Sequence, residues 1–298
     1  MSFNNFNSPV DHTSDAGYRT WGLQLFNEFD AINPGILTRT ADTGQANWVT
    51  ATRPGVNTYT QYGDWKLDEG GGITPLYIKL EVGTGPSATG PGWRLSVGTG
   101  TNGAGTLTGF VTTTLLCHVN SVPSSTVTNR ASYISCDNGH LAIGWKVGAT
   151  AQGGMCCFAI MRSVDPAAAI TSVGVVVVGL NNPGSAGLAA AGRSISLTTG
   201  VQISNTTAAW CADYWDINTT ITTGGNTTAW RWFGVFDNVT VPLVGAVTCL
   251  ATEQGIGTQF TTIPVGVSAI NYLALSGVHC SWSYGTSTQN RTLAIRWT

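Results

Sequence analysis

The sequence contains few charged residues. Asp, Glu, Lys and Arg make up 9% of its 298 residues, and the formal net charge is -2, whereas an ordinary soluble domain has about 25% charged residues. Such a chain attracts nucleic acid, anionic membranes and acidic substrates only weakly. Broad contacts with other proteins cost less than usual, because few ions must leave water. The composition therefore disfavours nucleic-acid binding and favours assembly with other proteins.

Long apolar segments and a secretion signal are also lacking. The most apolar run, VGVVVVGL at 173–180, has eight residues, and a transmembrane helix needs about 20. The N-terminus, MSFNNFNSPVDHTSD, has neither the basic start nor the apolar centre of a Sec signal peptide. We therefore expect no membrane insertion and no signal-peptide-dependent secretion. The apolar run is expected to be a buried strand.

The cysteines do not form a recognisable framework. There are seven, an odd number, and no CxxC pair occurs among them. Their spacing therefore supports neither a zinc ribbon nor a complete set of disulfides. Two interpretations stay open: reduced thiols buried in a strand-rich core, and disulfides, including bonds between subunits, formed after release from a reducing cytosol. The candidates are Cys117, Cys136, Cys156, Cys157, Cys211, Cys249 and Cys280.

Alternation of apolar residues is the strongest pattern that is present. In the segment 73–109, two runs with a two-residue apolar period flank a Gly/Pro-rich loop, and a second Gly-rich segment follows. This is the period of half-buried strands, so we predict a β-hairpin with one buried face. The members of that face are Leu76, Ile78, Leu80, Val82, Trp93, Leu95 and Val97. The two Gly-rich segments are expected at the strand ends, within reach of neighbouring subunits.

The rest of the chain has a similar strand-rich pattern. Runs rich in Thr, Val and aromatic residues, separated by turn residues, predict about a dozen strands. One sizeable amphipathic helix is expected in WGLQLFNEFDAI at 21–32, and a short helical piece in SAGLAAAGR at 185–193. The segment 63–72, GDWKLDEGGG, holds three carboxylates and is interpreted as a solvated loop. The predicted fold class is all-β, an antiparallel β-sandwich or jelly roll.

The chain is expected to consist of an arm and one domain. Residues 1–20 are polar and contain Pro9, which predicts an N-terminal arm of the kind that lies on neighbouring subunits. Residues 21–298 are expected to form one β-sandwich domain, since no charged or low-complexity linker divides them. A subdivision near residue 165 stays open, because Asp165-Pro166 and the alanines after it have the pattern of a helix start.

Two motifs suggest chemistry that their context does not support. The segment 98–103 matches GxGxxG, but Thr and β-branched residues follow, and no acidic residue stands about 20 positions further on. The segment is therefore expected to connect strands rather than to hold a phosphate. Cys and His are adjacent at 117–118 and 279–280, yet neighbouring strand residues face opposite sides, which disfavours a metal or thiol site. No cofactor and no metal is predicted.

For one aromatic cluster, a role in binding or cleaving sugars stays open. Between residues 210 and 237, aromatic residues lie close to Asp213 and Asp216, and this combination is typical of surfaces that bind or cleave sugars. The competing interpretation is packing within or between subunits, because each ring buries a large area. The candidate residues are Trp210, Tyr214, Trp215, Trp230 and Trp232. A glycan-binding or glycan-cleaving module, with a host-surface glycan as its partner, is therefore the alternative function.

Residues 20–120 include three segments to compare with known families: YIKLEVGTG, WRLSVGTGTNGAG and TLTG. These segments resemble virion structural proteins of tailed bacteriophages. The resemblance implies assembly without catalysis, and it carries over no catalytic residue. The expected place is a head decoration, a neck or collar, or a tail fibre or baseplate, and the resemblance does not choose among these. The implied partners are other virion proteins and copies of the chain, with a trimer favoured. The chain would assemble in the host bacterial cytoplasm and reside in the virion.

Overall fold

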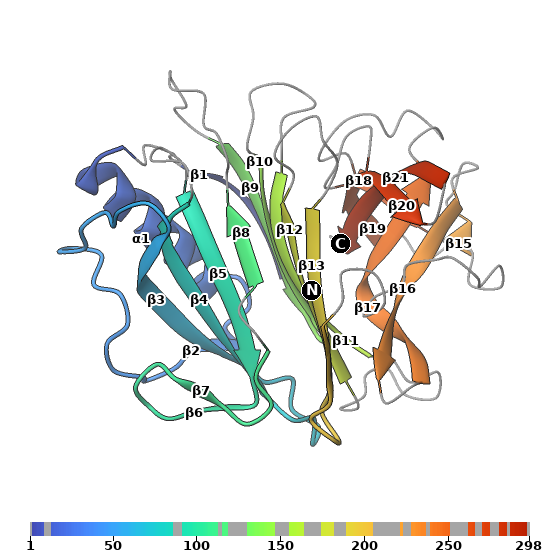
Figure 1. Cartoon of the computed structure of the whole chain (residues 1–298), viewed down its shortest axis with the longest axis horizontal. Helices are drawn as coiled ribbons and strands as arrows, with labels where there is room; N and C mark the ends of the chain where they lie inside the picture. The colour runs from blue at the N-terminus through green and yellow to red at the C-terminus, as the bar shows by residue number, and fades with distance from the viewer. Residues whose placement is uncertain are drawn as a thin grey trace.

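Antiparallel strands dominate the structure, a computed structural model (Figure 1). It describes residues 2–8, 13–85, 91–112, 115–118, 130–146, 155–163, 174–181, 189–204, 221–222, 228–236, 239–250, 262–265, 270–274, 280–284 and 287–296. Twelve strands have seven or more residues, in agreement with the expected number of about a dozen. One helix lies near the N-terminus. The predicted fold class, an antiparallel all-β sandwich, is confirmed.

The first sheet contains the predicted hairpin and has the order β2-β3-β4-β5-β8. Its strands are β2 (Leu37–Arg39), β3 (Thr58–Leu67), β4 (Leu76–Thr84), β5 (Pro91–Gly98) and β8 (Leu115–His118). Leu80 lies opposite Leu95, and Val82 lies opposite Trp93. All seven residues of the predicted inward face are buried, so the hairpin and its orientation are confirmed.

The second sheet, also antiparallel, has the order β1-β9-β10-β11-β12-β13-β14. Its strands are β1 (Ser2–Ser8), β9 (Arg130–Asp137), β10 (His140–Lys146), β11 (Met155–Arg162), β12 (Gly174–Asn181), β13 (Ala189–Ser196) and β14 (Gln202–Ser204). The expected arm contributes β1, which pairs with β9 from Ser2 opposite Cys136 to Ser8 opposite Arg130. Residue 165 lies between β11 and β12, which are neighbours in this sheet.

The prediction of a short helix in SAGLAAAGR is wrong for the second half of this segment. Residues 189–196 form β13 and pair with the whole of β12. Alanine favours helix in isolation, but this preference is weak and tertiary context overrides it. Here β12 offers backbone partners to eight consecutive residues, which a single helical turn could not match.

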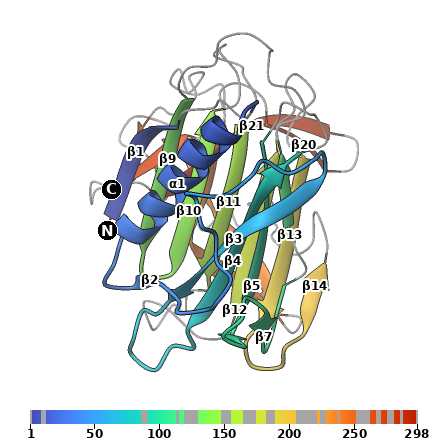
Figure 2. The same cartoon turned by 90° about the vertical axis from the view of Figure 1, so that its left-hand side faces the viewer.

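Side chains of the first two sheets and of helix α1 (Asp15–Ala31) form one buried core. The two sheets do not close into a barrel. Helix α1 lies along their open side, where it contacts β1 of one sheet and β2 of the other (Figure 2). No described helix is long and apolar enough to cross a membrane.

Helix α1 begins at Asp15, six residues before the predicted start at Trp21 and within the expected arm. Ser14 precedes it with extended backbone, and its Oγ accepts a hydrogen bond from the Gly17 amide at 3.1 Å. This N-cap satisfies an amide that lacks a partner inside the helix. The buried stripe has three- and four-residue spacing and consists of Tyr18, Trp21, Gly22, Leu25, Phe26 and Phe29.

The interpretation of 63–72 as a solvated loop is wrong for two of its three carboxylates. Asp68 is partly exposed and pairs with Lys66 at 2.6 Å. In contrast, Asp64 on β3 is completely buried, and the Glu69 side chain is 1% exposed and bound to Arg162. Both carboxylates are covered by segments far away in the sequence, which local polarity does not reveal.

The third sheet has the order β15-β16-β17-β21-β19-β18, with β20 paired to β21. Its strands are β15 (Ile221–Thr222), β16 (Thr228–Phe236), β17 (Val239–Leu250), β18 (Thr262–Val265), β19 (Ile270–Ala274), β20 (Cys280–Tyr284) and β21 (Ser287–Arg296). Strands β16 and β17 contact β11, β12 and β13, so the third sheet forms a further layer on the second (Figure 1).

The GxGxxG segment connects strands, as predicted. After the end of β5 it forms β6 (Gly100–Thr101) and turns into β7 (Leu107–Thr108), with Thr101 opposite Leu107. Gly103 and Gly105 have φ angles of 80° and 75°, which glycine adopts far more readily than other residues. The other Gly-rich segment follows β4 at the opposite end of the hairpin strands, so both segments lie at strand ends.

Candidate functional site

Most of the predicted aromatic cluster lies outside the described residues. This holds for Trp210, Tyr214 and Trp215. Trp230 and Trp232 are on β16, whose pairing with β17 changes register between Arg231 and Phe233. Trp232 therefore sits at an irregularity of the strand pair. Glycan binding at 210–237 stays a prediction.

Cys136 on β9 is a free, buried thiol. Burial raises its pKa to about 12, with the nearby carboxylates of Glu69 and Asp137 acting in the same direction. A thiol with such a pKa is protonated at neutral pH and unreactive. Of the other candidates, Cys117 is on β8, Cys156 and Cys157 on β11, Cys249 on β17 and Cys280 on β20, and Cys211 lies outside the described residues. Among the described side chains, no group of three or more His, Cys, Asp or Glu could hold a metal ion.

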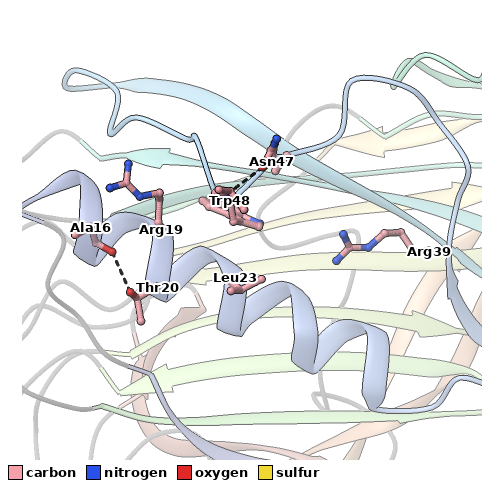
Figure 3. Close-up of a pocket in the computed structure, with 9 residues that line it drawn as sticks. Ala16, Arg19, Thr20, Leu23, Arg39, Asn47 and Trp48 are labelled. Atoms are coloured by element: carbon pink, nitrogen blue, oxygen red, sulfur yellow. Dashed lines mark hydrogen bonds between the residues drawn. The ribbon is translucent and has the colours of Figure 1, made fainter.

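An open groove of about 600 Å³ runs between the first half of α1 and the segment that precedes β3. Figure 3 shows Arg19 and Arg39 at its two ends, with Trp48 and Leu23 between them. The lining residues are Ala16, Arg19, Thr20, Leu23, Arg39, Ala46, Asn47, Trp48 and Val49.

The centre of the groove is apolar. Trp48 is 6% exposed, and its ring meets Phe26 edge-on at a centroid distance of 5.0 Å and Tyr18 at 5.4 Å. This packing continues into the core and fixes the ring. Leu23 and Val49 flank it and are 48% and 83% exposed. Exposed apolar side chains that adjoin a fixed aromatic ring are typical of surfaces that contact another protein.

The two arginines at the ends of the groove are held in place. Arg39 binds Asp30 through two hydrogen bonds, Nε to Oδ1 at 2.9 Å and Nη2 to Oδ2 at 2.8 Å. Arg19 donates from Nη1 to the Ala51 carbonyl at 3.1 Å. Ordered guanidinium groups lose little conformational entropy when they bind a further carbonyl or carboxylate. The groove therefore combines an apolar centre with hydrogen-bond donors at its ends.

Gly22 allows Trp48 to lie on the helix. A Cβ atom at this position would be 2.1 Å from the Trp48 ring, far inside contact distance. Sequence reasoning identified the helix but missed the groove. The available signals were a glycine within the amphipathic stripe and a tryptophan in the polar segment that precedes β3.

Replacing Gly22 by alanine should destabilise the protein, although alanine is the better helix former by about 1 kcal/mol. The methyl group displaces the Trp48 ring, and overpacking of this kind costs about 1–3 kcal/mol. Urea unfolding followed by circular dichroism measures the change. Gly55→Ala is the matched control, since no atom lies within 4 Å of a Cβ there. A Gly22→Ala protein as stable as the wild type would show that Trp48 moves without cost.

No protein-family model, curated protein or solved structure matches the chain.

Proposed function

We propose that this protein is a non-enzymatic structural component of a bacteriophage virion. It assembles through protein–protein contacts with copies of itself and with other virion proteins, as a closed symmetric oligomer with a trimer favoured. The proposal includes assembly in the host bacterial cytoplasm and residence in the virion. The sequence resemblance and the low charge support it, because an interface with few ions has little to desolvate.

The observation that carries the proposal is the apolar centre of the α1 groove. Val49 is 83% exposed directly beside the fixed Trp48 ring. Covering such side chains contributes about 25 cal/mol for each Å² of apolar surface removed from water. The arginines at the ends can bind main-chain carbonyl or carboxylate oxygens of the partner. The groove thus has the apolar core and polar rim of a protein interface.

Mass spectrometry and immuno-labelling of purified virions test this function. We expect the chain to be present in stoichiometric amounts in particles purified through a density gradient. Particles that contain no copy of the chain would overturn the proposal, whatever the properties of the isolated protein.

Replacing Val49 by aspartate tests the groove as the contact surface. The exposed position tolerates the change, whereas a buried charge in an interface weakens association by at least about tenfold, or about 1.4 kcal/mol. Incorporation into virions produced with the variant measures the effect. Val201→Asp is the matched control, since Val201 is 52% exposed and does not line the groove. Equal incorporation of both variants would exclude the groove.

A further inference from the structure

A buried carboxylate lies on the outer face of the first sheet, away from the core. Asp64 on β3 is 0% exposed, and neither of its carboxylate oxygens has a hydrogen-bond partner among the described residues. In the register of β3 and β4 it lies directly opposite Lys79. An unpaired carboxylate at such a depth is costly in its ionised form. Two features of the structure around Asp64 determine where the Lys79 ammonium group lies.

The first feature is the attachment of the β6–β7 hairpin. Lys79 donates from Nζ to the Gly105 carbonyl at 2.6 Å. The Asp42 carboxylate accepts hydrogen bonds from the Gly105 amide at 3.1 Å and from the Thr101 hydroxyl. Thr43 donates its amide to the Gly103 carbonyl at 2.9 Å. The hairpin is therefore held by one ammonium group and by the segment that contains Asp42 and Thr43.

The second feature is the close approach of Gly105. A Cβ there would lie 2.3 Å from the Tyr62 hydroxyl, so only glycine allows the hairpin to come this near. The Lys79 ammonium lies 4.3 Å from the centroid of the same Tyr62 ring. Lys79 thus occupies a narrow position between the ring, the hairpin and Asp64.

Lys79 has two competing acceptors in this position. Directly opposed residues of antiparallel strands have Cβ atoms about 4.5–5.5 Å apart, so a small rotation brings the ammonium to Asp64. A hydrogen bond to an ionised carboxylate is about twice as strong as one to a neutral carbonyl. The observed arrangement, with Lys79 on Gly105 and Asp64 unpartnered, is the one that suits a neutral Asp64.

We propose that Lys79 is shared between Gly105 and Asp64, so that protonation of Asp64 fastens the β6–β7 hairpin to the sheet and ionisation of Asp64 loosens it.

The charges around Asp64 determine the pH range in which its carboxyl group gains or loses the proton. Burial raises the pKa of Asp64 to about 6, Lys79 opposes the shift, and Asp42 and Glu81 add to it. Tyr62 and Lys66 share its face of β3, and the segment 100–108 carries no titratable side chain. The hairpin is fastened when the Asp64 carboxyl group carries its proton. Fastening is therefore complete well below pH 6 and is lost as the pH rises through about 6.

The hairpin adjoins a partly exposed apolar segment. Phe110 and Val111 follow β7 and are 37% and 36% exposed. The Phe110 amide donates to the Thr99 hydroxyl at 3.1 Å, and Thr99 in turn donates its amide to the Thr108 carbonyl. Loosening the hairpin weakens this hold on the Phe110 amide, while the Phe110 ring keeps its place against Gly200.

Amide hydrogen exchange of the wild type and of Asp64→Asn tests the proposal. The reporters are the Asn102 amide, bound to the Thr106 carbonyl, and the Thr43 amide, bound to the Gly103 carbonyl. The ratio of wild-type to variant rates at each pH cancels the intrinsic pH dependence of exchange. We expect a ratio near 1 at about pH 5 and of about 10 at about pH 7.5, the factor for losing one charge-assisted hydrogen bond.

Two further variants and one direct titration make the outcome decisive. Lys79→Met should leave the reporters fast at both pH values, and Asp68→Asn, which removes a partly exposed carboxylate just beyond β3, should keep the wild-type response. Carbon-13 NMR of the wild-type carboxyl groups should give Asp64 a midpoint near 6. A ratio that does not change with pH, a protected hairpin in Lys79→Met, or an Asp64 midpoint near 4 would each overturn the proposal.

Discussion

Replacing Arg162 by methionine should lower the free energy of unfolding by about 3–5 kcal/mol. Arg162 ends β11 in the second sheet, and Glu69 belongs to the connection between β3 and β4 in the first. Their side chains are 0% and 1% exposed. The variant leaves the Glu69 carboxylate in the interior without its counterion.

The geometry explains why the loss is large. Arg162 binds Glu69 in the bidentate manner, with Nε to Oε1 at 2.6 Å and Nη2 to Oε2 at 2.8 Å. The same Nη2 also donates to the Thr74 carbonyl at 2.8 Å. One side chain of the second sheet therefore binds a carboxylate and a main-chain carbonyl in the loop of the first. Gly70, Gly71 and Gly72 follow with positive φ angles and allow the loop to turn back toward β4.

A double-mutant cycle separates the ion pair from packing. Glu69→Met alone should also be strongly destabilising, whereas the double variant should recover much of the loss, because an apolar pair leaves no charge buried. Lys66→Met is the matched control. The Lys66–Asp68 pair has side chains 34% and 38% exposed, so water screens the attraction and losing the pair should cost far less than losing the buried pair. Equal losses for Arg162→Met and Lys66→Met in urea unfolding would contradict the assignment of Arg162–Glu69 as a bridge between the sheets.

Replacing Trp65 by alanine should cost about 3–5 kcal/mol, the usual range for removing a large buried aromatic side chain. Trp65 on β3 is completely buried. Its ring meets Phe26 edge-on at a centroid distance of 5.0 Å and Phe29 at 4.8 Å. It therefore connects the first sheet to the second half of α1.

Trp65 also organises the polar groups at this end of the helix. Its Nε1 donates to Asp30 Oδ1 at 2.9 Å, and Asp30 binds Arg39, whose guanidinium lies 5.2 Å from the Trp65 ring centroid. Gly63 leaves room for the ring, since a Cβ there would be 2.4 Å from it. The alanine variant therefore loses packing and the support of Arg39 in the α1 groove.

Trp65→Phe distinguishes these contributions. It keeps most of the aromatic packing and loses the hydrogen bond to Asp30, so we expect a cost of about 1–2 kcal/mol. Denaturant midpoints of both variants give the comparison. A loss below about 1 kcal/mol for Trp65→Ala would mean that α1 does not depend on this contact for its position.

The hairpin of β4 and β5 could be predicted from the sequence because its information is local. Apolar residues at every second position specify both the strand and its buried face, and a register shift by one residue would expose all of them. Low charge likewise follows from composition alone. The helix was predicted from its spacing, although its start at Asp15 depends on the Ser14 cap.

The candidate sites could not be predicted in the same way. The groove requires Trp48 to lie across Gly22, two residues separated by the second half of α1, by β2 and by part of the segment after β2. Asp64 and Glu69 belong to one polar run, yet both are buried and each contacts a different distant segment: Asp64 is bonded to the segment 40–45, and Glu69 to the end of β11. Polarity in a sequence predicts exposure only when nothing distant covers it.

The sequence by itself determined the all-β class, the hairpin face and the weak charge, because periodicity and composition act between neighbouring residues. Only the tertiary structure decided that the polar N-terminus becomes β1, that an alanine-rich segment becomes β13, and that Asp64 and Glu69 are buried. A distant backbone edge supplies the partner for β1 and β13, and Arg162 supplies the opposite charge for Glu69. For Asp64 the distant segment 40–45 binds its backbone amide and carbonyl. The free energy of such a contact outweighs a local preference that rarely exceeds about 1 kcal/mol per residue.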